Sequence, residues 1–285
     1  MRLSIEINLP ALRERVATFA KAGAEGVTLA IKPSAVAELG ATARRDVEHT
    51  IRSRGLTPAA VRVTLPGKGL AAGFDADRVL DGLRRALGFA RDSGFATLAC
   101  DLGALPRTVE TARPQPKRAD AGLLILPTAD DIARVAGEAD AEAKPLSAAE
   151  REHGDAVDEV LRAIGAAADP IAVPIAFGAS IADTAALSAA LVRADAPLFL
   201  RELDPAGAAS ELAADVDAVV MRPPPILHVL ATDAQVSGSR ARPADLGAGD
   251  VPWPDLLAAL RDSDFAGWLA ARDVADLERL RRLLD

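Results

Sequence analysis

Carboxylate, imidazole and ammonium side chains follow short apolar runs along this chain. Glu202 and Asp204 lie in the run Glu-Leu-Asp-Pro, and His228 begins the run His-Val-Leu-Ala-Thr-Asp. Asp101 ends an earlier apolar run, and Lys32 follows another. These residue types supply general acids, general bases and ligands for metal ions. Together they are candidates for binding a small polar ligand.

Several candidates also have a purely structural interpretation. Asp204 precedes Pro205, so its carboxylate can equally cap a turn. His228 is one of only three histidines, and an interior histidine more often satisfies a neighbouring polar group than binds a ligand. Trp268 can stack on a sugar ring, but core packing is the commoner role of a barrel tryptophan. Both interpretations stay open at this point.

Eight short apolar runs, separated by longer helical patterns, must position these residues. This alternation is typical of βα units around a parallel sheet, and 285 residues suit one (β/α)8 barrel, or TIM barrel. The predicted strands are 3–7, 26–31, 61–65, 96–101, 171–177, 198–203, 226–231 and 267–271. The predicted helices are 10–22, 42–54, 77–93, 148–167, 181–194 and 274–284. We therefore predict an α/β fold with a single domain over residues 1–285.

Two segments do not fit the alternation of strands and helices. Residues 107–146 are rich in proline and charge, and we expect an ordered insertion or a long loop there, over the barrel mouth. Residues 215–225 contain a short apolar run before three prolines. Because eight strands are already assigned, we interpret this run as the remains of the sixth helix.

Side chains of barrel strands alternate between the helix-facing side and the barrel interior. In the first predicted strand the aliphatic row should meet the helices, which turns Ser4 and Glu6 inward. The same rule turns inward Thr28, Lys32, Arg62, Thr64, Thr97, Asp101, Ala176, Gly178, Glu202, Asp204, His228, Leu230, Trp268 and Arg272. So many polar side chains in a barrel require either a binding site or a network in which they satisfy one another.

Composition and charge argue against several function classes. A net charge of −8 has the wrong sign for a duplex nucleic-acid surface, and the absence of tyrosine argues against a stacking platform for single strands. No apolar run reaches the length of a membrane span or a signal peptide. The single cysteine, Cys100, fits a reducing compartment. We expect a cytoplasmic protein that binds neither nucleic acid nor membrane; the sequence does not indicate an oligomeric state.

The end of the chain resembles a known family. A Gly-x-Gly-Asp-x-x-Trp loop at 247–253, a leucine-rich helix and the run Phe-x-Gly-Trp-Leu at 265–269 resemble the last barrel unit of sugar phosphate isomerase/epimerases. These proteins belong to the xylose isomerase-like TIM-barrel superfamily. The match is clearer over 171–273 than over 11–106. The resemblance implies a TIM barrel, a small carbohydrate substrate and a catalytic divalent metal, Mn²⁺ or Mg²⁺.

The residues at the family's four metal-ligand positions are mostly of other types here. The resemblance implies a glutamate where this chain has Gly178, an aspartate at Asp204, a histidine at Leu230 and a glutamate at Arg272. Only Asp204 is retained, and one carboxylate does not hold a divalent metal. The missing glutamates would also have served as acid and base. We therefore expect no metal cofactor and a metal-free ligand-binding or non-catalytic barrel. The alternative is an active sugar isomerase/epimerase that acts on a small carbohydrate or sugar phosphate with a non-standard site, and the alternative cofactor is Mn²⁺ or Mg²⁺.

Arg272 suggests what replaces the metal. A guanidinium group can form a bidentate bond with a carboxylate and occupy the space of a divalent cation. Our hypothesis is that Arg272 pairs with Asp204 or Glu202 inside the barrel. The complete set of ligand-binding candidates is Lys32, Asp101, Glu202, Asp204, His228, Trp268 and Arg272.

Overall fold

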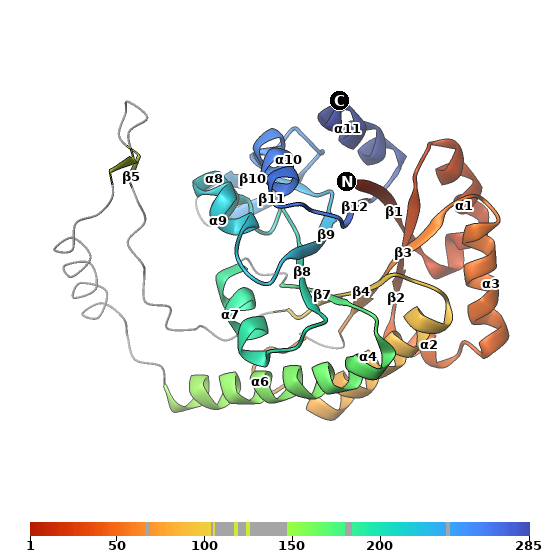
Figure 1. The fold of residues 1–285 in the computed structure, drawn as a ribbon, viewed down its shortest axis with the longest axis horizontal. Helices are drawn as coiled ribbons and strands as arrows, with labels where there is room; N and C mark the ends of the chain where they lie inside the picture. Colours follow the sequence, from red (N-terminus) through yellow and green to blue (C-terminus); the bar gives the residue numbers. More distant parts are fainter. Residues whose placement is uncertain are drawn as a thin grey trace. The chain divides into compact units, whose positions relative to one another are not determined.

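The computed structural model contains a closed barrel of eight parallel strands (Figure 1). It describes residues 1–65, 69–103, 105, 117–118, 124–125, 147–179, 184–237 and 240–285. The barrel strands are β1 (Arg2–Asn8), β2 (Gly26–Ile31), β3 (Thr57–Thr64), β4 (Thr97–Asp101), β7 (Ile175–Gly178), β8 (Phe199–Leu203), β9 (Ile226–Leu230) and β12 (Trp268–Ala271). Around the ring they follow one another in sequence order, and β12 pairs with β1. The predicted TIM barrel is confirmed.

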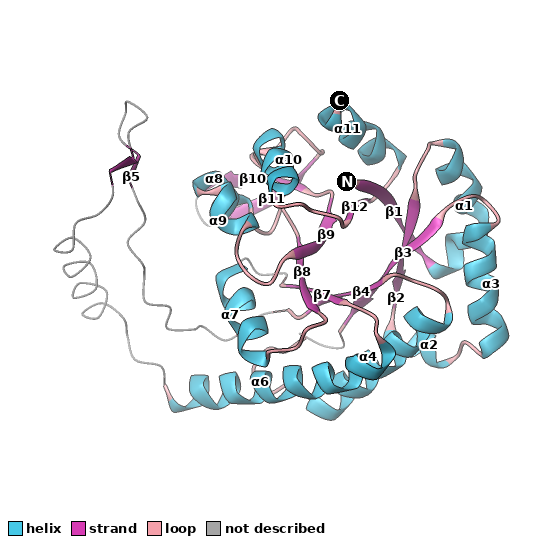
Figure 2. Cartoon of the chain, in the orientation of Figure 1, coloured by secondary structure: helices cyan, strands magenta, loops and turns pink. Residues whose placement is uncertain are grey.

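Helices lie outside the ring of barrel strands, as Figure 2 shows in cyan and magenta. Their bounds are α1 (Leu12–Lys21), α2 (Pro33–Ala37), α3 (Ala41–Arg52), α4 (Ala76–Asp92), α6 (Ala148–Ala168), α7 (Thr184–Ala194), α8 (Ala209–Ala214), α9 (Val216–Val220), α10 (Trp253–Asp262) and α11 (Val274–Leu284). Within the described ranges, no helix has both the length and the apolarity needed to cross a bilayer.

The core lies between the outer face of the strands and the apolar faces of the helices. Ile5 and Ile7 of β1 are buried on this side, as are Val79 and Leu83, which lie one helical turn apart in α4. The Asp75 carboxylate begins α4 by accepting a hydrogen bond from a backbone N–H of its first turn, at 3.0 Å. Because the aliphatic rows face the helices, the polar residues between them point into the barrel.

The fifth barrel strand is shorter than the sequence predicts. The predicted strand began at residue 171, whereas β7 begins at Ile175. Residues Asp169–Ile171 form a 3-10 turn instead, and Ala172 then adopts a left-handed conformation with a φ of 57°. Pro174, which precedes β7, has no N–H to donate to a strand ladder. The prediction relied on apolar character alone, so it placed the residues of this turn in the strand.

The sixth helical segment is split into α8 and α9. Asp215 separates them in an extended conformation, and its carboxylate accepts a hydrogen bond from the Ala218 backbone N–H at 2.9 Å, which begins α9. The helical interpretation of 215–225 is thus confirmed for Val216–Val220. An unpredicted hairpin follows β9, in which β10 (Asp233–Ser237) pairs with antiparallel β11 (Arg240–Ala244). Each strand has only five residues, so the alternation of Ala234 and Val236 with polar residues is a weak signal.

The chain divides into two compact units, residues 1–105 with 156–285 and residues 106–155. The first unit contains the barrel. In the second unit β5 (Lys117–Arg118) pairs with antiparallel β6 (Leu124–Ile125). The rest of the insertion predicted at 107–146 lies outside the described residues, so its order and its place over the mouth stay predictions.

Arg201 ties the split helical segment to the barrel. It lies in β8 next to Glu202 in sequence but points to the opposite side, and it is 2% exposed. The guanidinium donates hydrogen bonds at 2.5–2.9 Å to four carbonyl oxygens, those of Val219, Val220, Arg222 and Pro224. Burial, together with the like charge of Arg222, lowers the pKa of Arg201 to about 10. This buried cation therefore binds the carbonyl groups at the end of α9.

Replacing Gly88 by alanine should stabilise the barrel. A methyl group at Gly88, in the middle of α4, would meet no heavy atom within 4 Å. Because alanine loses less backbone freedom than glycine in a helix, Gly88→Ala should raise the free energy of unfolding by about 0.5–1 kcal/mol. Gly267→Ala is a contrasting variant, since its methyl would overlap the Leu227 carbonyl and should destabilise the protein. Urea denaturation measures both; a less stable Gly88→Ala would contradict the prediction.

Candidate functional site

Polar side chains from five strands form one hydrogen-bonded network in the barrel interior. The hydroxyls of Ser4 and Thr28 lie 2.9 Å apart, and Thr28 Oγ1 lies 3.3 Å from His228 Nε2. The other ring nitrogen of His228 is 2.9 Å from one carboxylate oxygen of Glu202. Arg62 Nε donates to the second Glu202 oxygen at 3.4 Å. The strand alternation placed these five residues inside the barrel, and the structure joins them.

Glu202 is a paired, ionised carboxylate at the centre of this network. Its side chain is 2% exposed. Burial opposes ionisation, but the charge of Arg62 and the hydrogen bond with His228 outweigh it and lower the pKa of Glu202. In return the charge of Glu202, with smaller contributions from Glu6 and Asp101, raises the pKa of Arg62 despite burial. We refer to these three side chains as the Arg62–Glu202–His228 network.

Gly178 leaves room for the carboxylate of Glu202. Gly178 ends β7, which pairs with β8. A methyl group at Gly178 would lie 3.0 Å from Glu202 Oε1 and 3.5 Å from Glu202 Cβ. The first distance is shorter than carbon–oxygen van der Waals contact, so Glu202 fills the space that a side chain at position 178 would enter.

Three ligand-binding candidates lie where strands end, at the carboxyl-terminal face of the barrel. Asp204 follows β8, is partly exposed and accepts a hydrogen bond from the Thr232 hydroxyl. Asp101 ends β4 and accepts from the Gly103 backbone N–H at 2.8 Å. Lys32 follows β2 and is exposed. Barrel active sites lie at this face, so these residues are placed where a ligand would bind.

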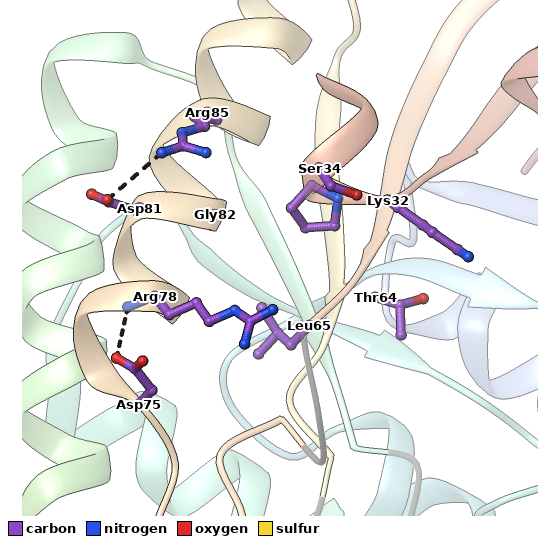
Figure 3. Close-up of a pocket in the computed structure, with 10 residues that line it drawn as sticks. Lys32, Ser34, Thr64, Leu65, Asp75, Arg78, Asp81, Gly82 and Arg85 are labelled. Carbon is purple, nitrogen blue, oxygen red and sulfur yellow. Dashed lines mark hydrogen bonds and ion pairs between the residues drawn. The ribbon is translucent and has the colours of Figure 1, made fainter. Parts of the chain in front are cut away.

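A groove of about 600 Å³ opens at the ends of β2 and β3, beside α2 and α4 (Figure 3). Its volume is within the range of small-molecule sites. Its lining residues are Lys32, Pro33, Ser34, Thr64, Leu65, Asp75, Arg78, Asp81, Gly82 and Arg85. We name it the α2–α4 groove.

The sequence matches no family model and no curated protein, but the fold has counterparts among solved structures. A xylose isomerase domain protein from Planctomyces limnophilus superposes with a TM-score of 0.70 at 13% identity, over 99% of this chain and 95% of that one. A 3-keto-D-glucoside 4-epimerase from E. coli gives 0.65 at 14% identity, over 99% of each chain. A D-psicose 3-epimerase in the presence of D-fructose gives 0.62 at 14%, over 95% and 84%. This chain has the xylose isomerase-like TIM-barrel fold.

In this xylose isomerase-like barrel, the four positions expected to bind a metal do not supply a suitable set of donors. Gly178 has no side chain, Leu230 is aliphatic and buried, and Arg272 is a cation. Only Asp204 offers an oxygen. Over the residues that the structure describes, no three His, Cys, Asp or Glu side chains lie close enough together to hold a metal ion. The four expected positions therefore offer one oxygen donor between them, fewer than a Mn²⁺ or Mg²⁺ centre needs.

The predicted pairing of Arg272 with Asp204 or Glu202 is wrong. Arg272 Nε donates to the Asp276 carboxylate at 3.0 Å, and the Arg272 side chain is 45% exposed. Asp276 lies in the first turn of α11 and is buried, so a carboxylate four residues further along the chain binds the guanidinium. The cation beside Glu202 is Arg62 instead.

Trp268 begins its strand at the amino-terminal end of the barrel, away from Lys32, Asp101 and Asp204 at the carboxyl-terminal face. It is the first residue of β12, and its ring packs against Gly26 at the start of β2. The Arg2 guanidinium lies 4.3 Å from the ring centroid. With 2% exposure at the amino-terminal face, Trp268 has the position expected of a core residue rather than of a sugar-stacking one.

Asp233 gives the Gly-x-Gly-Asp loop of this xylose isomerase-like barrel a structural role. One carboxylate oxygen accepts hydrogen bonds from the backbone N–H groups of Ala234 and Val251 at 2.8 and 3.2 Å. The other accepts from Gly247 at 2.8 Å and Gly249 at 3.2 Å. Asp233 is 1% exposed, and a side chain at Gly249 would overlap its carboxylate. The motif therefore brings backbone donors to a buried anion.

Sequence reasoning did not name two cations of this region as site residues. Strand alternation could have identified Arg62 as a site residue, because it predicts that Arg62 faces the barrel interior together with the acidic residues. Arg78 gave no such signal, because it lies on α4 and reaches the α2–α4 groove only through the packing of that helix beside β3.

Proposed function

We propose that this barrel binds a small carbohydrate-like ligand at its carboxyl-terminal face without a catalytic divalent metal. The Arg62–Glu202–His228 network is the observation that supports this best. The guanidinium of Arg62 and the imidazole of His228 engage the two carboxylate oxygens of the buried Glu202. A metal ion would have to displace Arg62 to reach Glu202, and would gain only Asp204 from the family's ligand positions.

The proposed contact residues are Lys32, Asp101 and Asp204. Charged side chains at a barrel mouth are suited to hydrogen bonding with hydroxyl groups. The likeness of fold to a D-psicose 3-epimerase studied with D-fructose supports a carbohydrate as the ligand class. The cytoplasm stays the predicted location, since Cys100 is a free, buried thiol.

Metal ions should not stabilise the wild-type protein against heat. We expect the melting temperature to stay within about 1 °C on adding Mn²⁺, Mg²⁺ or a chelator, whereas an ion bound at about 100 times its Kd would add about 2.7 kcal/mol. Asp204→Asn is the matched control, because it removes the one retained ligand position. Metal in stoichiometric amount, with a rise in melting temperature that Asp204→Asn abolishes, would contradict the proposal.

A sugar isomerase/epimerase with a non-standard site is the second candidate. The likeness of fold to the 3-keto-D-glucoside 4-epimerase favours it. Epimerisation by proton transfer exchanges a carbon-bound hydrogen with solvent. Incubation with D-fructose in deuterated water, followed by NMR, should show no incorporation above the buffer rate if the first proposal holds. Incorporation that Asp204→Asn removes would favour the second candidate.

A further inference from the structure

We infer that the α2–α4 groove binds an oxyanion of the phosphate type. The inference goes beyond the proposed function, because the groove is formed by β2, β3, α2 and α4 and shares only Lys32 with the proposed carbohydrate contacts. None of its lining residues belongs to the Arg62–Glu202–His228 network.

Two cations of the groove, Lys32 and Arg78, carry the inference. In the part of the chain that the structure describes, neither has a carboxylate within ion-pair distance, and both are exposed. Figure 3 shows Arg78 extending from α4 toward Leu65, while Lys32 projects from the end of β2 near Thr64. Two cations without an ion-pair partner on one concave surface attract an anion.

The two acidic residues of the groove are already engaged. Asp75 caps α4 by accepting from the Arg78 backbone N–H at 3.0 Å. Asp81 lies 3.8 Å from the Arg85 guanidinium and 3.9 Å from that of Arg84 (Figure 3 shows the first pair). Lys32, Arg78 and Arg85 against Asp75 and Asp81 give the lining of the groove a formal charge of 3 − 2 = +1, in a chain whose net charge is −8.

The remaining lining residues fit a small oxyanion. Ser34 and Thr64 bring hydroxyl groups that can donate hydrogen bonds, and Pro33, Leu65 and Gly82 form apolar walls. A guanidinium offers a planar pair of donors and an ammonium a compact charge, and phosphate is recognised by both. A phosphate has more acceptor oxygens than a carboxylate, so it can accept hydrogen bonds from more donors of the groove at once. The anion is either a free ion or the charged end of a larger ligand that reaches the mouth beside Lys32.

Calorimetric titration of the full chain with inorganic phosphate tests this inference. At constant ionic strength set with sodium chloride, we expect saturable binding that acetate does not match. Arg78→Gln should weaken phosphate binding about tenfold or more, and Lys32→Gln should also weaken it, since each removes a charged hydrogen-bond donor. Arg84→Gln is the matched control: it removes the same charge from α4, at a residue 55% exposed that does not line the groove, and should bind phosphate like the wild type.

Three results would overturn the inference: no saturable phosphate binding, acetate binding as tight as phosphate, or equal weakening by Arg84→Gln and Arg78→Gln. Competition by a hexose phosphate separates the two sources of the anion. If the hexose phosphate binds more tightly than inorganic phosphate, the groove holds the charged end of a larger ligand. If the two bind equally, the groove holds the free ion; both results support an oxyanion site. The metal-dependent melts are a separate measurement, so failure of the proposed function and failure of this inference can be distinguished.

Discussion

Glu202→Gln should lower the free energy of unfolding by about 3 kcal/mol near neutral pH. Removing one partner of a buried ion pair costs about 3–5 kcal/mol because the other charge stays buried, and the lower end applies here since the Arg62 side chain is 22% exposed. The variant keeps the size of the side chain but leaves the guanidinium of Arg62 with Glu6, 3.9 Å away, as its remaining ion-pair contact. Urea denaturation of wild type and variant measures the difference.

The loss should depend on pH in a defined direction. Because the pKa of Glu202 in the folded protein lies below its ordinary value of 4.5, the ionised carboxylate stabilises the fold above pH 4.5. That contribution is lost as the pH falls through the folded-state pKa. Glutamine does not titrate, so the stability gap between wild type and Glu202→Gln should narrow on acidification. A gap that is constant or widens below the ordinary pKa would contradict this account.

Glu6→Gln is the matched control for this experiment. Glu6 belongs to the same interior cluster, but its side chain is 27% exposed and its contact with Arg62 is longer. The expected loss is below about 1 kcal/mol, as for exposed ion pairs. Equal losses in the two variants would show that Glu202 has no special role at the centre of the network.

Arg201→Met should destabilise the barrel by about 4 kcal/mol. Methionine replaces the apolar stem of Arg201 but leaves the four carbonyl oxygens that the guanidinium binds with fewer donors, and each unsatisfied buried acceptor costs about 1–3 kcal/mol. Denaturant melts followed by far-UV circular dichroism give the free energy. The loss should appear in the global transition, because Arg201 joins α9 to a barrel strand.

Arg222→Met tests whether any arginine of this segment would give the same loss. Its side chain is 25% exposed and pairs with Glu211 at 3.4 Å, so the expected effect is within about 1 kcal/mol. A fully stable Arg201→Met protein would mean that water replaces the guanidinium at these carbonyls, which is incompatible with a residue 2% exposed.

The barrel was predictable because its elements are strongly periodic and closely spaced. The predicted bounds of β2 and α11 coincide with the observed ones, Gly26–Ile31 and Val274–Leu284. The start of β7 was not predictable, because hydrophobicity alone does not distinguish an apolar residue in a 3-10 turn from one in a strand. The β10–β11 hairpin was missed because each strand has only five residues, too few for the alternation of Ala234 and Val236 with polar residues to stand out.

The candidate site was predictable to the level of which side chains point inward, and no further. Strand alternation predicted that the side chains of Glu202, His228 and Arg62 face the barrel interior. It does not predict how far along the barrel axis each side chain lies. Trp268 therefore appeared beside the mouth residues although it lies at the other end. Nor does alternation decide between partners: Arg272 follows its strand and binds Asp276 of the next helix, while Arg62 extends to Glu202 inside the barrel.

The close approach of Glu202 to Gly178 makes these two positions interdependent in any redesign. A glutamate introduced at 178 alone would meet a second carboxylate in the same space, so the substitution becomes acceptable only together with a smaller residue at 202. Their energetic effects should be strongly non-additive. A stepwise path from this barrel to an ion-binding one through position 178 would therefore have to change position 202 first.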